Sequence, residues 1–256
     1  MLLDLDGCVR VGDQATPRAD EACAALRQAD RGVAFVTNDA RLSPEEVVQQ
    51  LWGLGVRASV LEVVTVGGAV QHVLAESPDL RSAFVIGSPA IHRHVENAGL
   101  RILNHTDLAR RSDVVVVAGH ERFDYAELRT AIQAVLEGAA LVCAGRDPTF
   151  PMPDGPWPGT GSLVAAVETA TGATALSVGK PEAQIFRTAL DRVGGESALV
   201  VGDNLAADVA GAHALGLDAA VVLSGLTTRE EAEAALEADP PIVAIADTLA
   251  DLVLRG

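Results

Sequence analysis

Two aspartates, Asp4 and Asp6, end the first apolar run of the chain, and Gly7 follows them directly. Side chains of a strand alternate between its two faces, so these carboxylates share a face for as long as the strand continues. Open α/β sheets bind ligands at the carboxyl ends of their strands, where both groups fall. One carboxylate could attack a substrate there while the other moves a proton. A plain turn before glycine explains the short pattern equally well.

A second apolar run, Leu199–Gly202, ends in the same way, with Asp203 next and Asp208 five residues later. A helix cap alone would account for Asp208. Between the two acidic segments lies Lys180, and Pro181 after it favours an extended or turn conformation at the lysine. Four carboxylates in one cleft cannot all stay ionised without cations. One lysine and one divalent metal ion would largely balance them.

A further apolar run ends in a hydroxyl and an amide, Thr37 and Asn38. Such donors, together with backbone amides of a loop, can hold the oxygens of a phosphoryl group. An ordinary turn before the next helix accounts for the same two residues. The segment gains a functional interpretation only in combination with the others.

In chain order the four segments read Asp-Leu-Asp-Gly, Thr-Asn, Gly-Lys-Pro and Gly-Asp-(four residues)-Asp. This combination resembles the haloacid dehalogenase-like (HAD) superfamily. The long insert between the second and third segments resembles subfamily IIA, the p-nitrophenyl-phosphatase and nucleotide-phosphatase branch. Further matches lie at Asp147–Pro151, Pro158–Glu168, Ala170–Gly172 and Val222–Thr227. The resemblance covers nearly the whole chain, although Asp39-Ala40 and Ala206-Ala207 depart from the usual pattern of the branch.

The resemblance implies a Mg²⁺-dependent phosphatase that hydrolyses small-molecule phosphomonoesters through an aspartyl-phosphate intermediate. Asp4 would be the nucleophile, and Asp6 the general acid and then the general base. Lys180 would neutralise charge that develops on the phosphoryl oxygens. The carboxylates of Asp4 and Asp203 and the backbone carbonyl of Asp6 would bind Mg²⁺, which prefers oxygen ligands.

The same resemblance implies roles around that centre. Thr37 and Asn38 would hold the phosphoryl oxygens, and Asp208 would orient Lys180 or the waters of the metal. Cap-loop residues near Arg146 and Asp147 would contact the leaving group. The substrate stays open among sugar phosphates, nucleoside monophosphates, glycerol phosphate, phosphoglycolate and pyridoxal phosphate. Analogy with the branch also implies a homodimer formed through the cap.

Three other functions fit parts of the pattern. A non-catalytic phosphate-ligand-binding or regulatory protein could use the same scaffold, but it would be indicated by loss of Asp4 or Asp6, and both are present. A phospho-receiver module also uses aspartate and lysine, but it is much shorter and has no insert. Dehalogenase chemistry, which also occurs in the superfamily, needs no metal cluster, so the metal cluster that Asp6 and Asp203 indicate argues against it.

Composition limits the partners. The 256 residues are 49% hydrophobic, enough for a folded core of one large or two smaller domains. The net charge of −16 would repel nucleic acid and anionic membrane surfaces alike. Three scattered cysteines, Cys8, Cys23 and Cys143, fit a reducing compartment better than a disulfide framework. No stretch has the length of a transmembrane helix or the pattern of a secretory signal, so the cytoplasm is expected.

Strand and helix signals alternate along the chain, which predicts an α/β fold: a three-layer, Rossmann-like parallel-sheet core with an inserted α/β cap. The predicted core covers residues 1–79 and 175–256, and the cap residues 80–174. Core strands are expected at Leu2–Leu5, Val33–Thr37, Val63–Val66, Leu199–Gly202, Ala219–Leu223 and Val243–Ala246, and helices at Ala19–Gln28, Ser43–Leu54, Gly68–Ala75, Glu182–Val193 and Ala206–Leu215. Cap strands are expected at Ala83–Ile86, Val114–Ala118 and Ala140–Cys143, and helices at Ala90–Ala98, Tyr125–Glu137 and Ser162–Thr171. The Pro/Gly-rich stretch Asp147–Gly161 is predicted to be irregular.

Overall fold

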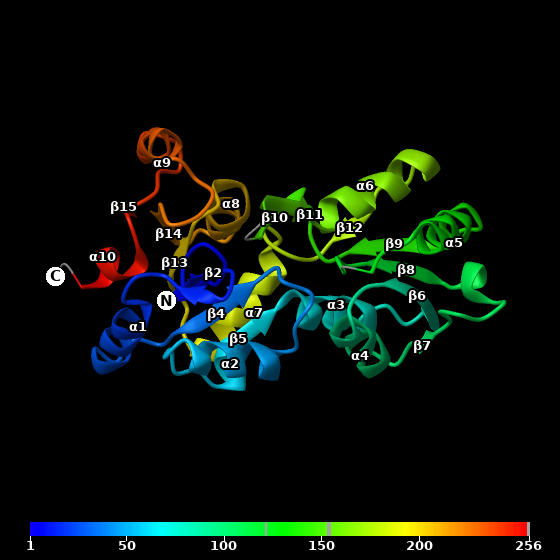
Figure 1. Cartoon of the computed structure of the whole chain (residues 1–256), viewed down its shortest axis with the longest axis horizontal. Helices are drawn as coiled ribbons and strands as arrows, with labels where there is room; N and C mark the ends of the chain where they lie inside the picture. Colours follow the sequence, from blue (N-terminus) through cyan, green and yellow to red (C-terminus); the bar gives the residue numbers. More distant parts are fainter. Residues whose placement is uncertain (121, 153–154, 255–256) are drawn as a thin grey trace. The chain divides into compact units, whose positions relative to one another are not determined.

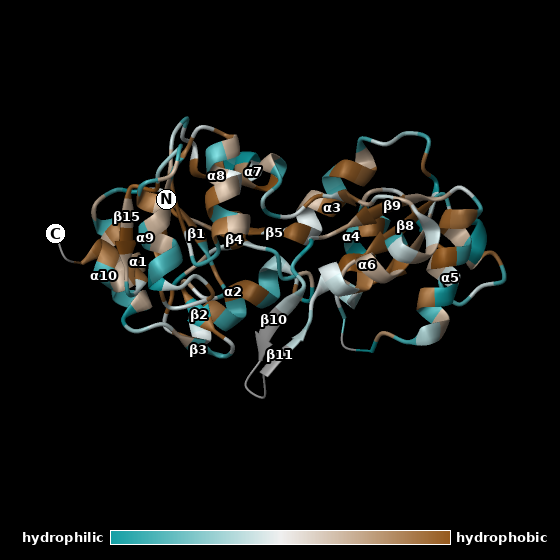
Figure 2. Ribbon diagram, turned by 90° about the horizontal axis from the view of Figure 1, so that it is seen from above, coloured by the Kyte–Doolittle hydropathy of each residue, from teal (hydrophilic) through white to brown (hydrophobic). Residues whose placement is uncertain are grey.

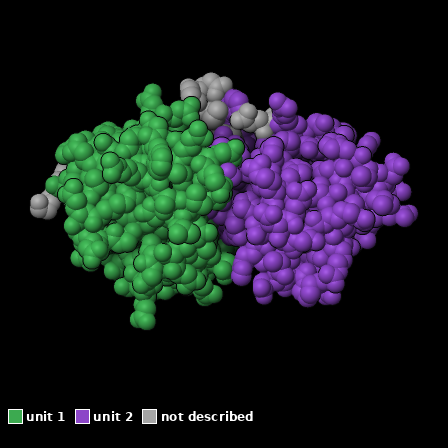
Figure 3. Space-filling model, turned by 90° about the horizontal axis from the view of Figure 1, so that it is seen from below, with its two compact units in different colours: residues 1–37, 44–64, 180–256 green, residues 38–43, 65–179 purple. Residues whose placement is uncertain are grey.

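The computed structural model describes residues 1–120, 122–152 and 155–254. The chain forms two compact units, coloured separately in Figure 3. Unit 1 comprises residues 1–37, 44–64 and 180–256, and unit 2 comprises residues 38–43 and 65–179. Each unit has a parallel sheet flanked by helices, so the predicted α/β, Rossmann-like fold class is confirmed. Within the described ranges, every helix is too short or too polar to cross a lipid bilayer.

A six-stranded sheet forms the centre of unit 1 (Figure 1). Its spatial order is β15 (Ala244–Ala246), β14 (Asp218–Val222), β13 (Leu199–Gly202), β1 (Leu2–Asp4), β4 (Ala34–Thr37) and β5 (Val63–Thr65). The pairs from β15 to β4 are all parallel. Strands β1 and β4 are fully buried, as expected for apolar strands covered on both faces. The chain order reverses at β1, and such a switch point is where open α/β sheets bind ligands.

Unit 1 also contains described elements of helix, one of them a short 3₁₀ turn. Among them are α1 (Ala19–Gln28), α2 (Pro44–Gly53), η1 (Val60–Glu62), α7 (Ala183–Val193), α8 (Ala210–Ala214), α9 (Arg229–Leu236) and α10 (Leu249–Val253). The buried face of α7 carries Ile185, Phe186 and Ala189. Gly211 of α8 lies against the Phe186 ring, and a Cβ at this position would overlap that ring. Gly211 of α8 therefore serves close packing.

Unit 2 contains a five-stranded parallel sheet in the order β12 (Leu176–Ser177), β9 (Ala140–Cys143), β8 (Val114–Val117), β6 (Ser82–Ile86) and β7 (Arg101–Ile102). Its helices are α3 (Val66–Ala75), α4 (Pro89–Asn97), α5 (Tyr125–Leu136) and α6 (Thr160–Thr171), with a short 3₁₀ turn η2 (Ala109–Arg111). All four valines of β8 are buried, and β8 confirms the strand predicted at Val114–Ala118 to within one residue. Figure 2 colours β8 as strongly hydrophobic.

Two antiparallel hairpins escape the sequence analysis. The strands β2 (Arg10–Val11) and β3 (Gln14–Ala15) are too short to show an alternating pattern. The strands β10 (Thr149–Met152) and β11 (Gly155–Pro158) pair within the stretch that was predicted to be irregular, so that prediction is wrong there. Proline argues against a strand in the sequence because it has no backbone N–H to donate to a neighbouring strand. Both strands of a two-stranded sheet are edge strands, and edge strands tolerate proline.

The segment after β13 also differs from the prediction. One helix was expected over Ala206–Leu215, but a π-helical turn η3 (Leu205–Val209) precedes the short α8. The Asn204 side chain accepts hydrogen bonds from the backbone amides of Ala206 and Ala207, at 3.0 and 3.2 Å. Turns of this wide kind are frequent at functional sites. Here the wide turn carries Asp208.

Candidate active site

Four of the candidate residues gather at the carboxyl ends of two neighbouring strands of unit 1. Asp4 is the last residue of β1, and Asp203 follows β13. These strands are parallel partners with Leu3 opposite Val201, so their ends meet at one edge of the sheet. Asp208 comes from η3, and Lys180 precedes α7. Sequence positions up to 204 residues apart, from 4 to 208, thus converge on one place, as predicted.

Lys180 links two of the aspartates. Its ammonium group donates to Asp4 Oδ1 and, at 2.7 Å, to Asp208 Oδ1. The exposed fractions of Lys180 and Asp208 are only 5% and 1%, so all three groups sit out of water. Burial alone would lower the pKa of Lys180, but the two carboxylates outweigh it, and the pKa is raised. Lys180 therefore stays charged and holds Asp4 in place.

Three buried carboxylates form a cluster with the donor set of a hard metal ion. One oxygen each from Asp4, Asp203 and Asp208 can be chosen so that all lie within 4.8 Å of one another. Burial raises the pKa values of Asp4 and Asp203, and the neighbouring carboxylates raise them further. Fully ionised, the three carboxylates and the Lys180 ammonium would together carry a charge of −2. A single Mg²⁺ ion would balance that charge, and its preference for oxygen ligands matches the cluster.

The segment Ser224–Thr227, already notable in the sequence, fixes Asp203. The Leu226 backbone amide donates to Asp203 Oδ2 at 2.7 Å, and Thr227 Oγ1 donates to the Asp203 carbonyl at 2.6 Å. A Cβ at Gly225 would overlap the Asp203 carboxylate, as would one at Gly7, where φ is +91°. These two positions need glycine because the carboxylate passes directly against their backbones.

Asp6 lies outside the buried cluster. Its Oδ1 accepts from Arg10 Nε at 3.1 Å, and its Oδ2 accepts from Thr37 Oγ1 at 3.3 Å. The exposed fraction of the Asp6 side chain is 35%, against 5% for Arg10. Arg10 also donates to the side chain of Gln50. The sequence did not indicate Arg10, because the short hairpin that begins with it leaves no pattern in the sequence.

The remaining candidates belong to unit 2. Asn38 Nδ2 donates to Asp147 Oδ2 at 3.0 Å. The Arg146 guanidinium donates to the Glu168 carboxylate at 3.0 and 3.3 Å and to the Ala175 carbonyl at 2.8 Å. Arg146 is thus tied to α6 and the segment after it. The roles of Asn38, Arg146 and Asp147 in binding a substrate stay predictions.

The glycine-rich motif before α6 has a packing role next to these residues. The Gly159 amide donates to the Pro148 carbonyl at 2.8 Å, and the Gly161 amide donates to the Asp147 carbonyl at 2.9 Å. A Cβ at Gly161 would overlap the backbone of Arg146. Glycine at these positions lets two backbone segments run against each other and so shapes the loop that carries Arg146 and Asp147.

Comparison with known proteins places the chain in a family. A model described as haloacid dehalogenase-like hydrolase matches residues 1–101, and one described as HAD-hydrolase-like matches residues 177–252. The D-glycerol 3-phosphate phosphatase of Mycobacterium tuberculosis is 37% identical over 91% of this chain, which spans only 65% of that protein's length. Chronophin of Rattus norvegicus is 35% identical over 93% of this chain and 80% of its own.

Solved structures agree with this placement. The crystal structure of the glycerol phosphate phosphatase from Mycobacterium tuberculosis, in complex with magnesium, matches with a TM-score of 0.88 and 36% identity, and the match covers 98% of this chain and 75% of that one. The p-nitrophenyl phosphatase from Archaeoglobus fulgidus matches with a TM-score of 0.87 and 27% identity, covering 99% and 97% of the two chains. With its acidic cluster at the switch point of a parallel sheet, the chain belongs to the haloacid dehalogenase-like hydrolases, among the phosphatases of subfamily IIA.

Proposed function

We propose that this protein is a Mg²⁺-dependent phosphatase that hydrolyses small-molecule phosphomonoesters through an aspartyl-phosphate on Asp4. One observation carries the proposal: oxygens of three buried carboxylates lie within 4.8 Å of one another, and only one ammonium group, that of Lys180, pairs with two of them, so that the fully ionised cluster would carry a charge of −2. Such a cluster is costly without a cation, and its oxygens suit a divalent ion. The magnesium complex of the related mycobacterial enzyme supports the choice of ion.

The carboxylates of Asp4 and Asp203 and the backbone carbonyl of Asp6 hold the metal in this proposal. Asp208 lies beside them and binds Lys180. The bound ion supplies charge shielding, so that a phosphate anion can approach the carboxylate of Asp4. The hydrogen bond from Leu226 keeps Asp203 turned toward the cluster.

The residues of unit 1 then divide the chemistry. The Asp4 carboxylate attacks phosphorus, the bond from phosphorus to the ester oxygen breaks, and Asp6 gives its proton to the departing alkoxide. In the second half a water molecule attacks the aspartyl-phosphate while Asp6 takes up one of its protons. The bond between phosphorus and Asp4 breaks, which releases orthophosphate and restores both carboxyl groups. Arg10 and Thr37 orient Asp6 through their hydrogen bonds to its two oxygens.

Further residues hold the substrate. Lys180 stabilises the charge on the transferring phosphoryl group while it positions Asp4. Thr37 and Asn38 bind phosphoryl oxygens, and Arg146 and Asp147 belong to the loop that selects the leaving group. We assign residues 1–79 and 175–256 to the catalytic core and residues 80–174 to the cap. The three cysteines are free and buried, which supports residence in the cytoplasm. By analogy with the branch, the proposal also includes a homodimer.

A phosphate-release screen with and without Mg²⁺ tests the function. The panel contains p-nitrophenyl phosphate, glycerol 3-phosphate, nucleoside monophosphates, sugar phosphates, phosphoglycolate and pyridoxal phosphate. We expect Mg²⁺-dependent turnover that Asp4→Asn abolishes while the circular dichroism spectrum stays unchanged. Near-normal turnover by Asp4→Asn would end the assignment of the nucleophile. If the protein binds a phosphate analogue but hydrolyses none of the esters, a non-catalytic binding protein replaces the phosphatase.

A further inference from the structure

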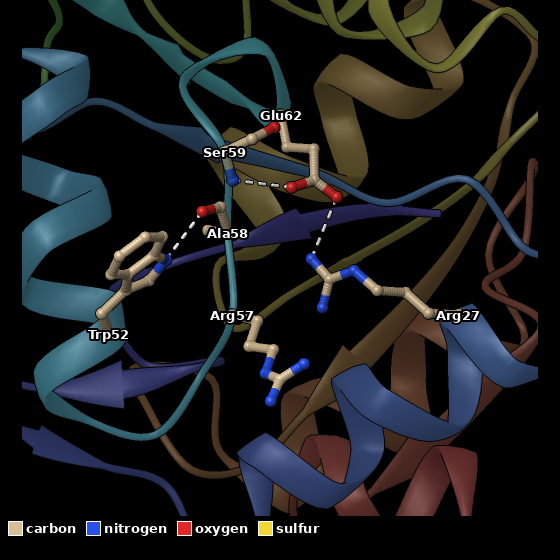
Figure 4. Close-up of a pocket in the computed structure, with 6 residues that line it drawn as sticks. All are labelled: Arg27, Trp52, Arg57, Ala58, Ser59 and Glu62. Carbon is tan, nitrogen blue, oxygen red and sulfur yellow. Dashed lines mark hydrogen bonds and ion pairs between the residues drawn. The ribbon is translucent and has the colours of Figure 1, made fainter.

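A cavity of about 520 Å³ opens on unit 1, apart from the acidic cluster (Figure 4). Its wall comes from α1, from the end of α2 and from the segment that leads through η1 into β5. The lining residues are Arg27, Trp52, Arg57, Ala58, Ser59 and Glu62. Its volume lies within the range of about 300–1,000 Å³ that is usual for small-molecule pockets.

Trp52 gives the cavity an aromatic surface. The residue is 65% exposed, although tryptophan is usually well buried. The indole Nε1 donates to the Ala58 carbonyl at 2.7 Å, so the ring is held in one orientation and its polar atom is satisfied. An exposed ring that is already fixed can stack on a flat ligand with little loss of conformational freedom.

The charges of the cavity are not balanced. Glu62 accepts from Arg27 at 3.0 Å and from the Ser59 backbone amide at 2.7 Å, so both of its oxygens are engaged (Figure 4). The side chain of Arg57 has neither an ion pair nor a hydrogen bond within the described parts of the chain. Two guanidinium groups and one carboxylate leave the cavity at +1, in a protein whose net charge is −16. The cavity therefore favours an anion, whereas the acidic cluster without metal repels one.

We propose that this cavity binds a small anionic ligand with an aromatic ring, of the class of nucleoside monophosphates, and that it is separate from the phosphatase site. The ring stacks on Trp52, and the phosphate pairs with the guanidinium of Arg57, whose planar fork suits phosphate oxygens. Neither feature alone selects such a ligand, because an aromatic surface binds any flat ring and an arginine binds any anion. Together they select molecules that carry both groups.

Calorimetric titration with AMP tests the site. The chain carries Asp4→Asn and is kept in EDTA, so that neither turnover nor metal-dependent binding contributes. Trp52→Leu and Arg57→Gln are compared with Arg101→Gln, a matched control at an exposed position of β7 in unit 2. An unchanged circular dichroism spectrum and an unchanged thermal unfolding midpoint for each variant report that the fold is intact. Adenosine and inorganic phosphate are titrated as the two halves of the ligand.

We expect one AMP per chain, and at least about tenfold weaker binding after either cavity substitution. Arg101→Gln should bind as the parent does, and adenosine and phosphate should each bind at least about tenfold more weakly than AMP. The proposal fails if AMP does not bind at about 10 mM, or if both cavity substitutions leave its affinity unchanged. It also fails if phosphate alone binds as tightly as AMP. Because these titrations need no turnover, their outcome does not depend on whether the ester screen succeeds.

Discussion

The substitution Asp203→Asn should stabilise the metal-free protein while it weakens magnesium binding. Asp203 is 3% exposed, and its carboxylate lies within 4.8 Å of those of Asp4 and Asp208. At that separation and an effective dielectric constant of about 20, each repulsion is worth about 3.5 kcal/mol. The attraction between Asp203 and Lys180, which the substitution also removes, offsets about one of these two repulsions. Asparagine still accepts from the Leu226 amide, and its new N–H groups cost about 1 kcal/mol.

The remaining gain is about 2.5 kcal/mol in the free energy of unfolding, which corresponds to a rise of about 5–10 °C in Tm for a chain of this size. Thermal unfolding in EDTA at pH 7.5, followed by circular dichroism, measures it. Asp107→Asn, at an exposed position of unit 2, is the matched control and should leave Tm unchanged. Added Mg²⁺ should raise the Tm of the wild type strongly and that of Asp203→Asn much less.

The stability difference between Asp203→Asn and the wild type should depend on pH. The pKa of Asp203 is raised in the folded state, so the fold favours its neutral form. The stability that this provides is present below the ordinary aspartate pKa and is lost as the pH rises through the raised value. The advantage of Asp203→Asn in EDTA should therefore shrink as the pH falls toward 4. If metal-free Asp203→Asn melts at or below the wild-type temperature at pH 7.5, the reasoning from buried like charges is wrong.

Three further outcomes follow from the same geometry. Asp6→Asn should slow hydrolysis of alkyl phosphates far more than that of p-nitrophenyl phosphate, whose leaving group needs no proton; equal slowing in steady-state assays would remove the proton role. Gly225→Ala should weaken Mg²⁺ binding at least about tenfold, because the Cβ of the new alanine displaces the Asp203 carboxylate. An unchanged Mg²⁺ affinity in calorimetry would contradict this. Lys180→Met should lower the free energy of unfolding of the metal-free protein, measured by urea denaturation, by about 3–5 kcal/mol, because it leaves buried carboxylates without their cation. A loss under about 1 kcal/mol would show that the cluster is already protonated.

Most of the fold could be predicted because long apolar strands carry their own signal. The four valines of β8 and the run before Asp203 gave their strands to within one residue. The hairpins could not be predicted in this way, because strands of two residues have no period and prolines disguise β10 and β11. The π-helical turn η3 carries Asp208 beside Lys180, which lies 28 residues earlier in the chain, and no local propensity encodes this contact.

The candidate site divides along the same line. Asp4 and Asp203 could be identified because each ends a buried strand, and parallel strands bring such ends together. Arg10 could not, because its importance rests on a hydrogen bond to Asp6 and not on its position in a pattern. The segment that fixes Asp203 was visible in the sequence only as part of the match at Val222–Thr227. The hydrogen bond from the Leu226 backbone amide to the Asp203 carboxylate can be seen only in the structure.

Two carboxylates only two residues apart occupy environments that suit opposite tasks. Asp4 is 6% exposed and is held by Lys180, so it cannot reorient freely. The Asp6 side chain is 35% exposed and is held by hydrogen bonds to both oxygens, so it keeps its direction while it remains open to solvent. A nucleophile benefits from the first environment and an acid–base group from the second. The difference arises because β1 ends at Asp4, which leaves Asp6 in the turn that leads to Arg10.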